Sequence, residues 1–157
     1  MLDQDVSPPI ADDRSEPSAR PTVLVVDDDT VHRMILTKVA TRVGWSATGA
    51  ATYEEAVALI GANAYDLITL DLTLGRRGGV EVLHALAAIG SATPVLIVSA
   101  SPEAIREESA GVGNVLSLNV CGSLAKPVDL VRLRQVLSGL RERSTIGLAP
   151  VAAPTFR

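Results

Sequence analysis

The stretch VLVVDDD, residues 23–29, places three consecutive aspartates directly after an uninterrupted apolar run. A short Val/Leu-rich run of this kind predicts a strand, Thr22–Val26, that is covered on both faces, as in a parallel sheet. The stretch therefore predicts a buried strand whose carboxyl end carries acids.

Further apolar runs follow along the chain. Leu67–Leu70 and Pro94–Val98 predict two more buried strands, and weaker patterns near Trp45–Thr48 and Ser123–Ala125 predict two others. Between these runs, apolar residues recur at helical spacing and are expected to face the core. These residues are Val31, Ile35, Val39 and Val43, then Ala56, Leu59 and Ile60, then Val80, Leu83 and Leu86, and finally Leu130, Leu133, Leu137 and Leu140.

One segment between the fourth and fifth strands is harder to assign. Pro102 suits the first turn of a helix, whereas Gly111 and Gly113 interrupt the apolar pattern behind it. We expect one helix that ends near Asn119. Five β/α units then follow one another, and right-handed crossovers predict an α/β, doubly wound parallel sheet with helices on both faces.

Composition limits the domain organisation. The chain has 157 residues, enough for one domain with tails. Residues 1–20, rich in Asp, Ser and Pro, are expected to form a disordered tail, and residues 144–157, rich in Ala and Pro, a flexible C-terminal tail. The folded domain is expected to cover residues 21–143.

Charge and hydropathy exclude several function classes. A net charge of −4 disfavours direct binding of nucleic acid, which needs a basic surface. No stretch approaches the roughly 20 apolar residues that span a bilayer, and the N-terminus lacks the apolar run of a signal peptide. The single cysteine, Cys121, allows no intrachain disulfide. We expect a cytoplasmic protein that binds neither nucleic acid nor membrane.

Polar residues follow the ends of four predicted strands. Asp27 and Asp28 come after the first strand and Asp71 after the third, while Ser99 follows the fourth and Lys126 the fifth. The carboxyl ends of parallel strands share one edge of a sheet, so these groups should converge. Converging carboxylates favour a hard cation such as Mg²⁺. A carboxylate beside a metal and a lysine can attack phosphorus and form an aspartyl phosphate.

Four segments resemble the signature segments of bacterial response-regulator receiver domains. They are VLVVDDD (23–29), YDLITLDLTL (65–74), PVLIVSA (94–100) and LAKP (124–127). They occur in the order and spacing of that family over nearly the whole predicted domain. The resemblance is consistent with a flavodoxin-like (βα)5 fold, for which we expect the strand order 2-1-3-4-5.

The resemblance implies a role for each residue of the site. Asp71 would be the phosphoacceptor. Asp28 would ligate Mg²⁺ directly alongside Asp71, and Asp27 would bind the metal through water. The backbone carbonyl of Thr73 would be a further protein ligand. The residues that would bind the phosphoryl group are Ser99 and Lys126, and the peptide bond from Lys126 to Pro127 is expected to be cis.

Two departures from the family pattern concern the readout of phosphorylation. Ser123 stands three residues before the lysine, where the family usually has Tyr or Phe. The coupling between the hydroxyl switch and an aromatic rotamer is therefore expected to be absent or rebuilt. The loop after the acceptor reads Gly75, Arg76, Arg77, Gly78, Gly79, and we expect it to be more flexible and more basic than in the family.

The function implied is that of a single-domain response regulator in a two-component phosphorelay. A histidine kinase or a phosphotransfer protein would donate the phosphoryl group to Asp71, and an effector protein would receive the signal. The last helix is a candidate face for a homodimer. The chain is not expected to be an enzyme beyond its own phosphorylation and autodephosphorylation.

Two other functions remain as alternatives. One is a receiver-like module that binds a partner without being phosphorylated, which Ser123 and the altered loop would permit. The other is a haloacid-dehalogenase-like phosphatase, because DDDTV (27–31) fits the nucleophile pattern of those enzymes. That second alternative lacks its acidic pair, since no Asp or Glu lies between Glu81 and Glu103.

Several residues near the acids have simpler interpretations. Asp29 and Thr30 are expected to cap the first helix rather than bind a ligand. His32 is expected to be an exposed residue early in the first helix and His84 to lie on a helix face, neither with a functional role.

Overall fold

A single parallel sheet lies at the centre of the chain, in the order β2-β1-β3-β4-β5. The computed structural model describes residues 20–74, 78–100, 111–112, 114 and 116–145. The predicted doubly wound α/β fold and its strand order are confirmed. The strands are β1 (Thr22–Val26), β2 (Ser46–Ala50), β3 (Leu67–Leu70), β4 (Val95–Ser99) and β5 (Val120–Ala125).

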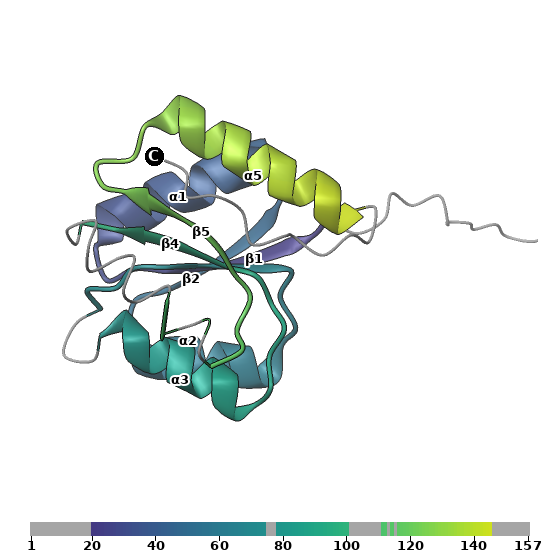
Figure 1. Ribbon diagram of the computed structural model, residues 1–157. Helices are drawn as coiled ribbons and strands as arrows, with labels where there is room; N and C mark the ends of the chain where they lie inside the picture. Colours follow the sequence, from purple (N-terminus) through teal and green to yellow (C-terminus); the bar gives the residue numbers. More distant parts are fainter. Residues whose placement is uncertain (1–19, 75–77, 101–110, 113, 115, 146–157) are drawn as a thin grey trace, which may run out of the picture.

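Helices cover both faces of this sheet (Figure 1). The described helices α1 (Thr30–Arg42) and α5 (Leu130–Thr145) lie on one face, and α2 (Tyr53–Ala62) and α3 (Gly79–Ala88) lie on the other. Capping side chains define where the first two helices begin. Asp29 accepts the His32 amide at the start of α1, as predicted, and Thr52 accepts the Glu55 amide at the start of α2.

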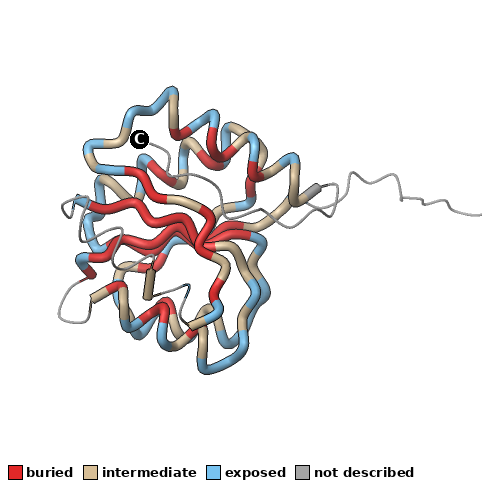
Figure 2. The backbone as a smooth tube through the Cα atoms, viewed as in Figure 1, coloured by how far each residue is buried: buried red, intermediate tan, exposed pale blue. Residues whose placement is uncertain are grey.

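The sheet separates two apolar cores, and the burial of its central strands is clear in Figure 2. Alternate residues of each strand enter opposite cores. In β1, Val23 and Val25 pack under α1 and α5, while Leu24 and Val26 pack under α2 and α3. Trp45 is fully buried in the first core, and its indole nitrogen donates to the Leu137 carbonyl at 3.0 Å.

The predicted apolar stripe of α1 is only half correct. Val31 is 64% exposed and Ile35 is 38% exposed, whereas Leu36 and Ala40 are buried. Each four-residue step advances about 40° beyond a full turn, so a strict four-residue series leaves one helix face. Of the residues predicted to face the core from α5, Leu133, Leu137 and Leu140 are buried, whereas Leu130 at the start of the helix is exposed.

Element boundaries differ most in the last part of the chain. β5 begins at Val120, earlier than predicted, and Ser99 ends β4 instead of following it. Of the helix predicted from Pro102 to Asn119, residues 101–110 lie outside the described residues. The chain is helical at Asn114 but leaves the helix before Ser117, whose φ of 65° is left-handed.

Most of the predicted tails, residues 1–20 and 144–157, lies outside the described part of the chain. Residues 144 and 145, predicted as tail, belong instead to α5, which continues to Thr145. Among the helices that are described, none is both long and apolar enough to cross a membrane.

Thr69 is a polar residue in the middle of β3. It is 2% exposed, between Ile68 and Leu70, which both face the α2–α3 core. Strand alternation therefore turns Thr69 toward the core under α1 and α5. Within the described residues, its buried hydroxyl has no hydrogen-bond partner. Such a group costs roughly 1–3 kcal/mol of desolvation, so this position lowers stability.

We predict that Thr69→Val raises the free energy of unfolding by about 1 kcal/mol, because valine has the same shape and no unsatisfied hydroxyl. Urea denaturation followed by far-ultraviolet circular dichroism measures the change. Thr48→Val, at an exposed position of β2, is the matched control and should change stability by less than about 0.5 kcal/mol. A destabilised Thr69→Val variant would contradict this interpretation.

Candidate functional site

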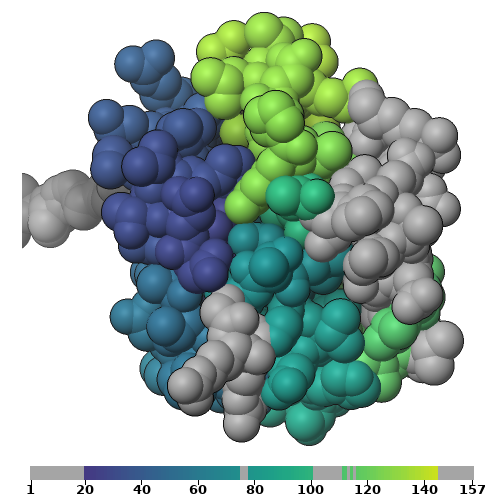
Figure 3. Space-filling view, turned by 90° about the vertical axis from the view of Figure 1, so that its left-hand side faces the viewer, coloured from purple at the N-terminus to yellow at the C-terminus, as the bar shows by residue number. Residues whose placement is uncertain are grey.

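Backbone hydrogen bonds align the carboxyl ends of the strands. The Asp71 amide donates to the Val26 carbonyl at 3.0 Å, and the Lys126 amide donates to the Ser99 carbonyl at 3.1 Å. These bonds continue the ladders of β1 with β3 and of β4 with β5. Figure 3 looks onto this edge, where the purple start of α1, the teal segments after β3 and the yellow-green connection to α5 meet.

Three carboxylates converge at this edge, as the sequence predicted. Asp27, Asp28 and Asp71 each place an oxygen within 4.8 Å of the others. Asp27 and Asp71 are buried, whereas Asp28 is exposed. A compact set of carboxylate oxygens, open to solvent on one side, fits a hard divalent cation that keeps some of its water. These residues can therefore hold a metal ion.

Lys126 lies between the two buried acids. Its Nζ is 2.9 Å from Asp27 Oδ2 and 3.2 Å from Asp71 Oδ2. Burial alone would lower the pKa of Lys126, but the hydrogen bond to Asp27 and the charge of Asp71 outweigh burial and raise this pKa. The ammonium therefore stays charged and compensates the two carboxylates. The Lys126–Pro127 bond is cis, as expected.

The Asp27 carboxylate is held from several sides. Its Oδ1 accepts the Asp29 amide at 2.9 Å, and its Oδ2 accepts Lys126. Burial alone would raise the pKa of Asp27. The hydrogen bonds from Lys126, the Asp29 amide and His32 outweigh burial, so this pKa lies below its usual value. Asp27 is therefore an ionised, firmly oriented carboxylate.

Sequence reasoning missed His32 as a contact of this site. The expectation of an exposed helix residue is wrong, because its Nδ1 lies 2.7 Å from Asp27 Oδ2 and its side chain is 16% exposed. Arg33 was missed as well, and its guanidinium donates to the Asp27 carbonyl at 2.7 Å. Helical side chains tilt toward the N-terminus, so residues in the first turn after an acidic loop can reach back to it. That position was the available signal.

Asp71 has fewer partners than Asp27. Its Oδ1 accepts the Thr73 amide at 2.9 Å, and its Oδ2 faces Lys126. Burial raises the pKa of Asp71, and the charge of nearby Asp27 adds to that rise against the opposing effect of Lys126 and the Thr73 amide. The two buried carboxylates therefore differ, because the surroundings favour the anion overall at Asp27 and disfavour it overall at Asp71.

Gly79 packs closely against the backbone of Asp71 and Leu72. Its amide donates to the Leu72 carbonyl at 2.8 Å, and a Cβ at this position would lie 2.5 Å from the Asp71 carbonyl oxygen. Only glycine permits that approach. The expected loop flexibility does not apply here, because Gly79 is buried as the first residue of α3. Residues 75–77 of the predicted loop lie outside the described residues.

Two other predicted site residues occupy the same edge. Ser99 is fully buried at the end of β4, paired with Ala125 of β5, and its carbonyl accepts the amide of Lys126, which follows that strand. Thr73 is exposed two residues after Asp71. Ser123, at the position of the family's aromatic residue, is 7% exposed within β5.

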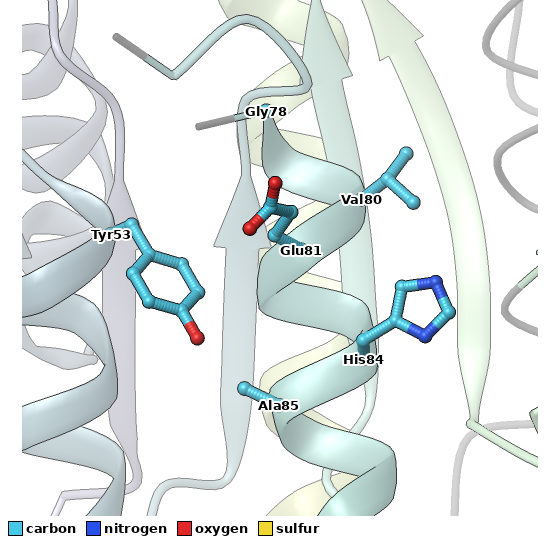
Figure 4. A pocket seen from close by; sticks show the side chains of 6 residues that line it. All are labelled: Tyr53, Gly78, Val80, Glu81, His84 and Ala85. Atoms are coloured by element: carbon cyan, nitrogen blue, oxygen red, sulfur yellow. The ribbon is translucent and has the colours of Figure 1, made fainter. Parts of the chain in front are cut away.

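A separate hollow lies between α2 and α3 (Figure 4). Tyr53 projects from α2 toward α3, where Glu81 and His84 project from the helix. His84 lies on a helix, as expected, and is exposed. The hollow contains none of the three carboxylates and no lysine. The chemistry is therefore concentrated at the carboxyl edge of the sheet.

Comparisons with known proteins agree with this arrangement. The family model described as response regulator receiver domain matches residues 23–138. The protein Regulator of RpoS from Escherichia coli (strain K12) is 32% identical over 124 residues, which cover 78% of this chain and 35% of that protein. The chain thus spans about a third of the length of this relative.

Solved structures share the fold. The receiver domain of the Francisella response regulator 1452 aligns with a TM-score of 0.66 and 29% identity, covering 79% of this chain and 98% of that one. The chemotaxis protein CheY4 of Vibrio cholerae aligns with a TM-score of 0.67 and 23% identity, covering 78% of this chain and 99% of that one.

We predict that Asp71→Asn unfolds at a higher urea concentration than the original chain at neutral pH without divalent cations. A raised pKa in the folded state adds stability that is fully present below the unfolded-state pKa and is lost as the pH rises through the folded-state pKa. Ionised Asp71 therefore lowers stability at neutral pH, and asparagine removes that charge.

The stability gain of Asp71→Asn should shrink as the pH is lowered toward the unfolded-state pKa of about 3.9. Urea midpoints across this pH range measure the change. Glu54→Gln, at an exposed position of α2, is the control and should show no comparable gain. A less stable Asp71→Asn variant at neutral pH would show that ionised Asp71 is a net stabilising group.

Proposed function

Since the chain belongs to the response regulator receiver domain family, we propose that it accepts a phosphoryl group on Asp71 in two-component signalling. The observation that carries this proposal is the buried Asp71 carboxylate, which faces Lys126 beside two further acids. Burial raises the pKa of Asp71, so nearby cations stabilise the ionised form of this carboxylate. Phosphoryl transfer needs this concentration of positive charge around the transferred oxygens.

The chemical step is a displacement at phosphorus. A carboxylate oxygen of Asp71 forms the new P–O bond, and the bond from phosphorus to the donor's leaving atom breaks with its electron pair staying on that atom. Lys126, already 3.2 Å from Asp71, compensates charge on a phosphoryl oxygen. The Ser99 hydroxyl would donate a hydrogen bond to a second oxygen. The product is an acyl phosphate on Asp71.

The acidic cluster supports Mg²⁺ as the cation of this site. Asp28 and Asp71 would be direct ligands, Asp27 would act through water, and the Thr73 carbonyl would complete the protein ligands. When bound, Mg²⁺ would neutralise charge on the transferring oxygens. Asp27, already ionised and fixed by several donors, would contribute charge without rearranging.

An exposed apolar surface next to the site supports a protein phosphodonor. Val31, Met34 and Ile35 are 64%, 49% and 38% exposed on the first half of α1. Their spacing of three and four residues puts them on one side of the helix. A donor that reaches Asp71 must approach the carboxyl edge, where α1 begins. We propose that a histidine kinase or phosphotransfer protein packs against these three side chains.

The event is a stoichiometric modification of the chain rather than turnover of a substrate. The added phosphoryl charge of about −1.5 to −2 would draw Ser99 and Lys126 toward it and shift the population of an effector-binding surface. The effector would be another protein, and α5 is the candidate homodimer face. We assign the exchange to the cytoplasm, where ATP-driven kinases generate the donor.

The first test is Mg²⁺-dependent labelling by a small phosphodonor such as acetyl phosphate. We expect one phosphoryl group per chain, no labelling of Asp71→Asn, and no labelling after chelation of the metal. Intact-mass spectrometry under mild conditions measures the adduct. Labelling that survives Asp71→Asn would exclude this acceptor, and an unlabelled original chain would favour the alternative of a binding module that is not phosphorylated.

The second test separates donor docking from chemistry. Met34→Glu places a charge on the exposed apolar surface of α1, so transfer from a phosphorylated phosphotransfer protein should fall by about tenfold, as at a central interface residue. Labelling by acetyl phosphate should change far less, since it needs no docking. Ile89→Glu, 60% exposed beyond the end of α3, is the matched control. Equal loss with both donors would refute the docking surface.

A further inference from the structure

The Asp27 carboxylate is over-supplied with donors at one of its oxygens. Oδ2 faces both His32 Nδ1 at 2.7 Å and Lys126 Nζ at 2.9 Å, while Oδ1 accepts the Asp29 amide. The Asp27 side chain is only 1% exposed, so each of these donors replaces a hydrogen bond that water would otherwise make to the carboxylate. Two donors at one oxygen therefore allow one of them to leave without stranding a buried charge.

His32 is fixed in place by local structure. Its own amide donates to the Asp29 side chain at 3.0 Å in the first turn of α1, and only 16% of its side chain is exposed. An ionised carboxylate can only accept hydrogen bonds, so Nδ1 of the imidazole carries the proton that it donates to Asp27. His32 therefore faces Asp27 as a hydrogen-bond donor.

Lys126 cannot serve Asp27 and a phosphoryl group equally. The ammonium now divides its hydrogen bonds between Asp27 and Asp71. Under the proposed function it turns toward a phosphoryl oxygen on Asp71, and its contact with Asp27 must then weaken. A buried carboxylate that loses a charged donor is destabilised unless another donor stays. His32 is the side chain already in position to stay.

We propose that His32 is a positioning residue that holds the Asp27 carboxylate while Lys126 turns to the phosphoryl group on Asp71. This inference rests on the proposed function. His32 touches neither the acceptor nor the phosphoryl group, and it acts through Asp27 and Lys126. This hydrogen bond lowers the free-energy cost of moving Lys126 away from Asp27 and keeps the acidic cluster aligned for the cation.

The test compares three variants. His32→Leu removes the donor, while His32→Asn keeps an amide nitrogen at the place of Nδ1. We expect His32→Leu to bind beryllofluoride about tenfold more weakly in the presence of magnesium, and Mg²⁺ alone up to about tenfold more weakly. His32→Asn should recover most of both affinities. His84→Leu, at the exposed histidine of α3, is the matched control and should resemble the original chain.

Affinities come from ¹⁹F spectra for beryllofluoride and from titration calorimetry for Mg²⁺. If His32→Leu binds both as tightly as the original chain, or if His32→Asn loses as much as His32→Leu, the positioning role is refuted. Those outcomes leave the proposed function standing, since labelling of Asp71 is measured separately. Conversely, labelling that survives Asp71→Asn refutes the proposed function while the Asp27 contact remains measurable.

A measurement on the unmutated chain keeps the inference testable if His32→Leu fails to fold. Long-range ¹H–¹⁵N spectra distinguish imidazole Nδ1–H from Nε2–H, and exposed His84 serves as an internal reference. We expect His32 to carry its proton on Nδ1 both before and after beryllofluoride binds. A His32 ring that loses this Nδ1–H on binding would show that it leaves Asp27 together with Lys126, which would overturn the proposal.

Discussion

The carboxyl edge of this sheet depends on the contacts that the Lys126 ammonium makes with both Asp27 and Asp71. Two buried carboxylates at neighbouring strand ends repel each other, and burial strengthens that repulsion. The ammonium of Lys126, directly after β5, compensates the charge of both carboxylates. The strand order makes these contacts possible. β1 and β3 are neighbours, and β4 places the end of β5 close enough for the lysine side chain to reach both acids.

The two buried acids have opposite electrostatic character although they share that lysine. Asp27 receives hydrogen bonds from an amide, an imidazole and the ammonium, and its pKa is lowered. Asp71 receives fewer, and its pKa is raised by burial. The difference follows from local structure, since α1 begins right after Asp27 and its first turn supplies donors. The result is one carboxylate that organises the site and one whose charge is left for other partners to stabilise.

Backbone packing supports this site as much as side chains do. Gly79 lies so close to the Asp71 backbone that any side chain at this position would displace it, and this contact ties the start of α3 to the end of β3. Ser123 is a position of β5 that departs from the family pattern. It stands in place of the aromatic residue expected from the family resemblance and lies buried in that strand, three residues before Lys126.

The sequence by itself determined the parallel sheet and the set of residues at its carboxyl edge, while the strand order was expected from the resemblance to receiver domains. Val23–Val26 is a continuous apolar run, and Leu67–Leu70 is apolar apart from Thr69. Short runs of this kind are typical of strands in a covered parallel sheet, whose carboxyl ends share one edge. Tertiary structure alone decided which side of α1 faces the core, where the helix before β5 ends, and that His32 contacts Asp27. Those outcomes depend on the rotation of a helix and on side-chain direction, which contacts between distant segments select and which residue spacing leaves open.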